Sequence, residues 1–122
     1  MDAIDLSWSA TETAELLRRK VISSRELTAA LLDRIEAVNP PINAVVEVRR
    51  EQAMADALVA DEAIAGGTEM GPLHGVPMTI KDSFDVAGLH TTWGNPVFSD
   101  FIADLIHRFG DMIGRMPRDV FS

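Results

Sequence analysis

The sequence predicts an α/β fold in which helices come first and a few strands of a mixed sheet follow. Three observations support this expectation. Two helix-start motifs are each followed by apolar residues at helical spacing, two short runs rich in β-branched or apolar residues lie further along, and a glycine- and proline-rich segment introduces the second run. At 122 residues the chain has room for one domain with a modest hydrophobic core.

Composition excludes several classes of function. The net charge of −8 and the isoelectric point of about 4.7 repel phosphate backbones and anionic lipid heads, so we expect neither a nucleic-acid nor a membrane partner. No apolar run reaches the ~18 residues of a membrane span, and the acidic start is unlike a signal peptide, which favours a cytoplasmic protein. The absence of cysteine excludes disulfides, thiolate zinc sites and a cysteine nucleophile.

Two capping boxes predict the first two helices. Ser9 is followed three residues later by Glu12, and Ser23 by Glu26. The apolar residues at helical spacing are Ala14, Leu17 and Val21 after the first box, and Leu27, Ala30, Leu31 and Ile35 after the second. Residues 39–41, Asn-Pro-Pro, should end the second helix because proline cannot continue the hydrogen-bond ladder.

A strand and a third helix are expected next. Residues 42–48 are short and rich in β-branched side chains, which is typical of a strand. The third helix should run from about Arg49 to Ala65 and end at the glycine pair 66–67. Its inward-facing residues are expected to be Met54, Ala57, Leu58 and Ile64.

The most informative segment is residues 71–82, Gly-Pro-Leu-His-Gly-Val-Pro-Met-Thr-Ile-Lys-Asp, which places a lysine at the end of a predicted strand over 76–81. A lysine in apolar surroundings either extends its ammonium to water or loses its charge and becomes a proton acceptor. Arginine cannot be deprotonated in a protein, so a neutral amine requires lysine. Lys81 is one of only two lysines in the chain. Because side chains alternate along a strand, Lys81 and Asp82 should point apart.

The chain changes character near Asp104. Residues 85–89 read as a turn and 91–96 as a loop, whereas residues 105–122 carry apolar side chains at helical spacing interrupted by two glycines. We therefore divide the chain into a main part, 1–104, and a divergent tail, 105–122, which could form a weak amphipathic helix.

An ordered series of short motifs runs through the main part. They are Glu36-Ala37-Val38-Asn39-Pro40 followed by Ile42-Asn43-Ala44, then Gly71-Pro72-Leu73-His74-Gly75-Val76-Pro77, Lys81-Asp82, and Asp85-Val86-Ala87-Gly88 leading to Thr91-Thr92. With this series the chain resembles, from about Leu6 to Asp104, the N-terminal part of an enzyme of the amidase signature family. The resemblance implies an N-terminal fragment of that family's fold, and hydrolysis of carboxylic amide C–N bonds by a lysine and two serines without a cofactor or a metal.

The resemblance implies a specific role for Lys81. The neutral amine would accept a proton from a serine in a cis peptide, which in turn activates the serine that attacks the amide carbonyl and forms an acyl-enzyme. The family's two serines lie in a glycine- and serine-rich segment that has no counterpart in residues 1–122. We therefore expect a truncated chain, inactive alone, that would act on a small-molecule amide only if completed.

Other serines and polar residues have alternative interpretations. The pair Ser23-Ser24 is best explained as a helix cap. Ser83 would lie roughly 7 Å from Lys81 on the same strand face, where a direct hydrogen bond between them would require a local bend, so Ser83 is an alternative partner or substrate-side residue. Asp82 could support Lys81 or simply end the strand, and Trp93 could line a substrate pocket or cap the core. His74, His90 and His107 have no metal-site spacing and are expected in turns or on the surface.

Two further functions compete with the truncated amidase. One is a non-catalytic binding or dimerisation module, and the other is a fragment of the A subunit of a tRNA-dependent amidotransferase, which the same resemblance covers. Unpaired strand edges would be adhesive, so self-association is also expected.

Overall fold

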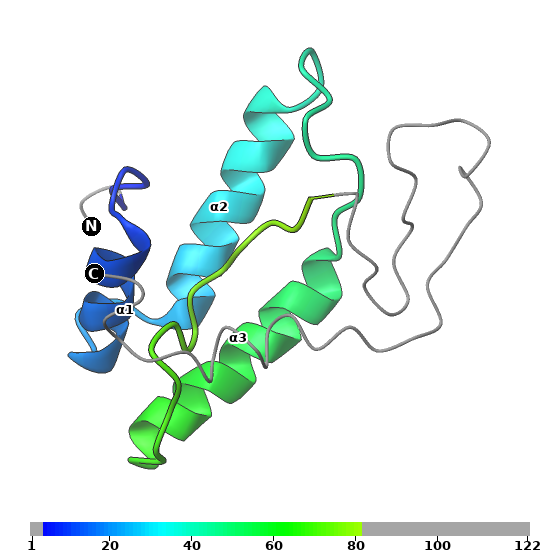
Figure 1. Ribbon diagram of the computed structural model, residues 1–122. Helices are drawn as coiled ribbons and strands as arrows, with labels where there is room; N and C mark the ends of the chain where they lie inside the picture. The colour runs from blue at the N-terminus through cyan, green and yellow to red at the C-terminus, as the bar shows by residue number, and fades with distance from the viewer. Residues whose placement is uncertain (1–3, 82–122) are drawn as a thin grey trace.

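The computed structural model describes residues 4–81, which form three helices joined by loops (Figure 1). They are α1 (Ala10–Arg18), α2 (Ser24–Val38) and α3 (Arg50–Ala65). Helices α2 and α3 pack against each other and run in opposite directions, and the segment after α3 turns back past the start of α2 and runs on between these two helices (Figure 1). None of the helices in this part of the chain is long and apolar enough to cross a membrane.

The two predicted capping boxes form. The backbone N–H of Glu12 donates to the Ser9 hydroxyl at 3.1 Å, and the Glu12 carboxylate accepts from the Ser9 N–H at 2.7 Å. The same pair of bonds joins Ser23 and Glu26, at 3.1 and 2.9 Å. These bonds satisfy N–H groups that have no partner inside the helix, which is why α1 and α2 begin where the sequence predicts.

Helix ends also follow the sequence. Helix α2 stops at Val38 with Asn39 as its C-cap, directly before the two prolines. Helix α3 begins at Arg50, with Arg49 as its N-cap, and stops at Ala65. Gly67 follows with a φ of 69°, a left-handed conformation that glycine adopts without steric cost.

A small apolar core holds the three helices together. Leu17, Ile22 and Leu27 are buried at its centre, and Leu17 has no exposed surface. The partly buried residues packed around it are Ile4, Trp8, Leu16, Leu31, Ile64 and Val76. Val76 is notable because it belongs to the segment that leads to Lys81, so that segment contributes to the core of the helices.

The two predicted strands are not present in residues 4–81, which is a correction to the sequence analysis. A strand needs a neighbouring strand for its backbone groups, and neither 42–48 nor 76–81 has one here. In the first segment the Asn39 side chain takes that place, because its amide accepts from the Val45 N–H at 2.9 Å and donates to the Val45 carbonyl at 2.8 Å. The segment is therefore a loop.

The prediction for the inner face of α3 was partly wrong. Ala57 is buried as expected and Met54 and Ile64 are half-buried, but Leu58 is 40 % exposed and its neighbour Val59 is 63 % exposed. The part of α3 that packs closely is narrow and built from alanines, Ala57 and Ala60. Small residues allow the returning segment to approach the helix.

Candidate active-site segment

Lys81, the sequence-predicted catalytic lysine, lies at the end of the segment that returns after α3. Its side chain is exposed, and residues 76–81 are irregular rather than a strand. The other predicted site residues, Asp82, Ser83 and Trp93, lie outside the described residues, as do the turn at 85–89 and the tail 105–122. The predicted opposition of Lys81 and Asp82 therefore remains a prediction.

The segment before Lys81 is fixed to the helices at Gly75. The buried Ser24 hydroxyl, with only 2 % of the residue exposed, donates to the Gly75 carbonyl at 2.6 Å. Gly75 has a φ of 78°, and a Cβ atom built on it would lie 3.5 Å from Leu17 and from Ser24 and 3.6 Å from Ala60. The turn thus needs a left-handed residue and brings backbone close to α1, α2 and α3 at once.

Two further contacts hold the same turn. The Arg18 guanidinium donates to the Pro72 carbonyl at 3.2 Å, and His74 Nε2 lies 3.0 Å from the Ala60 carbonyl. Within the turn, the N–H of His74 donates to the Gly71 carbonyl at 3.2 Å. His74 is a turn residue, as the sequence predicts, and in addition connects the turn to α3.

Asp61 organises the start of α2 from α3. Its carboxylate accepts from the backbone N–H of Ser24 at 2.7 Å and from that of Arg25 at 3.1 Å, and it forms an ion pair with the Arg25 side chain at 3.4 Å. A carboxylate at a helix N-terminus satisfies free N–H groups and complements the helix dipole. Sequence reasoning missed this residue because its partners are 37 and 36 positions away and no local pattern marks it.

The role of Ser24 also differs from the expectation. Of the pair Ser23-Ser24, only Ser23 is the predicted helix cap, with its hydroxyl accepting from the Glu26 N–H. Ser24 is the first residue of α2, and its hydroxyl is directed to the Gly75 carbonyl. The two adjacent serines therefore have different roles, one local and one tertiary.

Two carboxylates near the helix starts have perturbed acidities. Hydrogen bonding from Ser23 lowers the pKa of the Glu26 carboxyl below its ordinary value, and the backbone N–H contributes more than the hydroxyl. At Asp5 the hydroxyl of Ser7 and then its backbone N–H lower the carboxyl pKa in the same way. Both shifts favour the charged form, so these groups are hydrogen-bond acceptors rather than acids at neutral pH.

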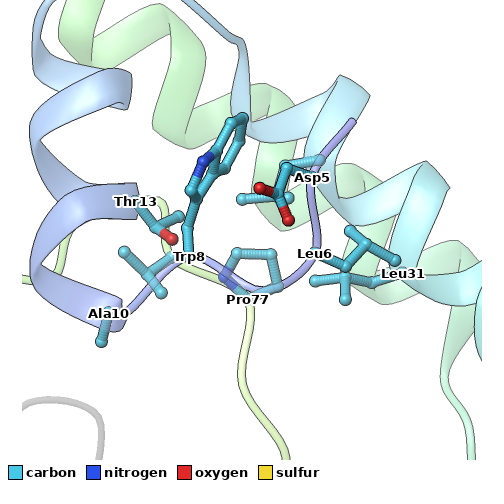
Figure 2. Close-up of a pocket in the computed structure, with 9 residues that line it drawn as sticks. Asp5, Leu6, Trp8, Ala10, Thr13, Leu31 and Pro77 are labelled. Carbon is cyan, nitrogen blue, oxygen red and sulfur yellow. The ribbon is translucent and has the colours of Figure 1, made fainter. Parts of the chain in front are cut away.

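A hollow of about 220 Å³ lies beside the turn, between the N-terminal segment, α1 and α2 (Figure 2). Its lining residues are Asp5, Leu6, Trp8, Ala10, Thr13, Leu27, Leu31, Val76 and Pro77. The Trp8 ring stands at one side and Pro77 at its base (Figure 2). The hollow is mostly apolar, and its Asp5 carboxylate is already engaged by Ser7.

Lys81 is the candidate amine that the described residues present. Its side chain is exposed to solvent, and within residues 4–81 no hydrogen bond joins it to a serine. No group of three His, Asp or Glu side chains in this part of the chain could hold a metal ion. The described residues therefore offer an exposed amine on a segment that is bonded to the helices at Gly75.

Comparison with known proteins supplies the wider context for this lysine-bearing segment. The sequence model of the family described as Amidase matches residues 26–105, about two thirds of the chain. The chain belongs to the amidase signature family. A solved bacterial aryl acylamidase of that family is 35% identical and superposes with a TM-score of 0.72 over 79% of this chain and 20% of its own. Its α/β fold agrees with the predicted fold class, although residues 4–81 contain only the helical part.

Individual relatives include amide hydrolases and part of an amidotransferase. An acylamidase of Rhodococcus erythropolis is 45% identical over 81% of this chain, and an indoleacetamide hydrolase of Bradyrhizobium diazoefficiens is 46% identical over 79%. The A subunit of a glutamyl-tRNA(Gln) amidotransferase from Moorella thermoacetica is 38% identical over 93%. The chain spans 21%, 18% and 25% of these three proteins, respectively.

Proposed function

We propose that this chain provides the lysine-bearing part of an amidase-type hydrolase of carboxylic amide C–N bonds, and that the 122 residues alone are inactive. The observation that carries the proposal is that the segment ending at Lys81 begins at a turn, residues 72–75, that is bonded to α1, α2 and α3. A base needs a defined position. Hydrogen bonds from three helices fix the start of the segment that ends at Lys81. Membership of the amidase signature family supports the chemistry.

In the proposed mechanism the neutral amine of Lys81 accepts a proton from one serine hydroxyl, and that serine accepts the proton of the nucleophilic serine. The nucleophile attacks the amide carbonyl, the C–N bond breaks, and ammonia or an amine leaves with a proton. Water then hydrolyses the acyl-enzyme and regenerates the serine. By the family resemblance both serines would belong to a glycine- and serine-rich segment that residues 1–122 do not contain, and we propose a small-molecule amide as the substrate.

A direct assay of the purified 122-residue chain tests the second half of the proposal. We expect no hydrolysis of simple aliphatic or aromatic amides above background, because a base without an activated nucleophile supports little acyl transfer. Turnover that is abolished equally by Lys81→Ala and by Ser83→Ala would contradict this and would show that the chain contains its own dyad.

A second candidate, favoured by the amidotransferase relatives, is the corresponding part of an amidotransferase A subunit. Both candidates use the same lysine, and they differ in the fate of the released ammonia. A completed enzyme that carries residues 26–105 of this chain would distinguish them, since ammonia would be released into solution in one case and transferred to a glutamyl-tRNA in the other. Stable self-association of the chain, with no activity in any completed form, would instead favour a non-catalytic module.

A further inference from the structure

A continuous chain of contacts leads from α3 through α2 to the segment that ends at Lys81. It starts at the Asp61 carboxylate, which binds the Ser24 N–H at 2.7 Å. It continues through the same residue, because the Ser24 hydroxyl donates to the Gly75 carbonyl at 2.6 Å. Gly75 lies six residues before Lys81, and Val76 directly after it packs into the core.

We propose that Asp61 and Ser24 are positioning residues for the catalytic lysine. Asp61 fixes the first turn of α2, and Ser24 transmits that position to Gly75, so that residues 76–81 start their path between α2 and α3 from one place and in one direction. This inference rests on the proposed function only in assigning the role of Lys81. The positioning itself is a property of the described residues.

The geometry separates this role from helix capping. Ser23 and Glu26 already form the complete capping box of α2, so the Ser24 hydroxyl is not needed to start the helix. Ser24 is nevertheless almost fully buried, at 2 % exposure, and its hydroxyl bond spans 51 positions of sequence. A buried hydroxyl costs free energy unless it is bonded, so the Gly75 carbonyl is a required partner rather than an incidental one.

The chain allows a clean spectroscopic test because it has no cysteine. Cysteines introduced at Arg34 on the exposed side of α2 and at the exposed Thr79 would carry the only two spin labels. Pulsed electron paramagnetic resonance of the full 122-residue chain then gives the distribution of distances between α2 and the segment before Lys81. Each variant is also checked for helix content and melting temperature by circular dichroism.

The decisive comparison is between adjacent serines. Ser24→Ala removes a tertiary hydrogen bond, and we expect the ratio of detached to docked segment to rise about 2- to 10-fold, as expected for one lost hydrogen bond of ordinary strength. Ser23→Ala is the matched control, because it removes a bond of the capping box in the same helix. It should lower the melting temperature but leave the distance distribution unchanged at temperatures where the chain is folded.

Two results would overturn the proposal. One is a folded Ser24→Ala chain with the distance distribution of the unmodified chain, and the other is a Ser23→Ala chain that detaches the segment equally. If Ser24→Ala does not fold, Asp61→Asn decides, since it keeps the serine and weakens only the bonds to the start of α2. An unchanged distribution in Asp61→Asn would then refute the inference. No step of this test involves amide hydrolysis. The positioning inference can therefore fail while Lys81 still acts as a base, and Lys81 can prove not to be a base while the positioning inference holds.

Discussion

Substitution of Gly75 tests the close approach of the turn to the three helices. Gly75→Val places a β-branched residue at a φ of 78°, which costs about 1–3 kcal/mol in backbone strain. Its Cβ would fit at 3.5–3.6 Å from Leu17, Ser24 and Ala60, but the two methyl groups beyond it would enter occupied space. Overpacking of this kind costs about 1–3 kcal/mol more.

Gly67→Val is the matched control for that substitution. Gly67 has a similar φ of 69°, but no atom lies within 4 Å of a Cβ built there, so only the backbone strain applies. Urea unfolding of both variants, followed by circular dichroism, should show Gly75→Val less stable than Gly67→Val by about 1–3 kcal/mol. Equal stabilities would refute the conclusion that the turn is packed against the helices.

Three other perturbations test the described residues. The pKa of Glu26 is lowered in the folded chain, so the contribution of its carboxylate to stability is present at neutral pH and is lost as the pH falls through that lowered pKa. Acid should therefore remove the difference in unfolding free energy between the unmodified chain and Glu26→Gln. Lys81→Met should change the free energy of unfolding by less than about 0.5 kcal/mol in urea titrations, because the side chain is exposed, and a larger loss would reveal a buried partner. Val46 and Val59 are 64% and 63% exposed, so sedimentation should show self-association that weakens in a Val46→Glu, Val59→Glu double variant, whereas a monomer at all concentrations would show that these residues are not adhesive.

The parts of the fold that sequence could predict are those set by neighbours in the chain. Both capping boxes, the stop at Asn39 and the glycine exit of α3 depend on residues within a few positions of one another, and all form as expected. The prediction of strands at 42–48 and 76–81 failed because a strand depends on a neighbouring strand, which the local sequence pattern does not reveal. β-branched composition alone could not show that the Asn39 side chain would bond Val45 instead.

The candidate site shows the same division. Lys81 could be singled out as the candidate base because a family motif surrounds it, and its role stays a prediction. Ser24 and Asp61 could not, because their contacts join residues 51 and 37 positions apart. In the sequence, Ser24 is next to the true cap Ser23 and is therefore interpreted as part of the cap. Asp61 is one of several acidic residues on an exposed helix.

The most direct test of the central claim, that Lys81 is a base held in place for amide hydrolysis, is a chimera. Residues 26–105 would replace the aligned segment of the Rhodococcus erythropolis acylamidase, to which the chain is 45% identical. The kcat for an acylamide would be measured with Lys81 and with Lys81→Ala in that background. We expect an active chimera that loses about 100- to 10,000-fold in kcat on the substitution, as for the loss of a general base. An active chimera whose kcat is unchanged by Lys81→Ala would contradict the claim.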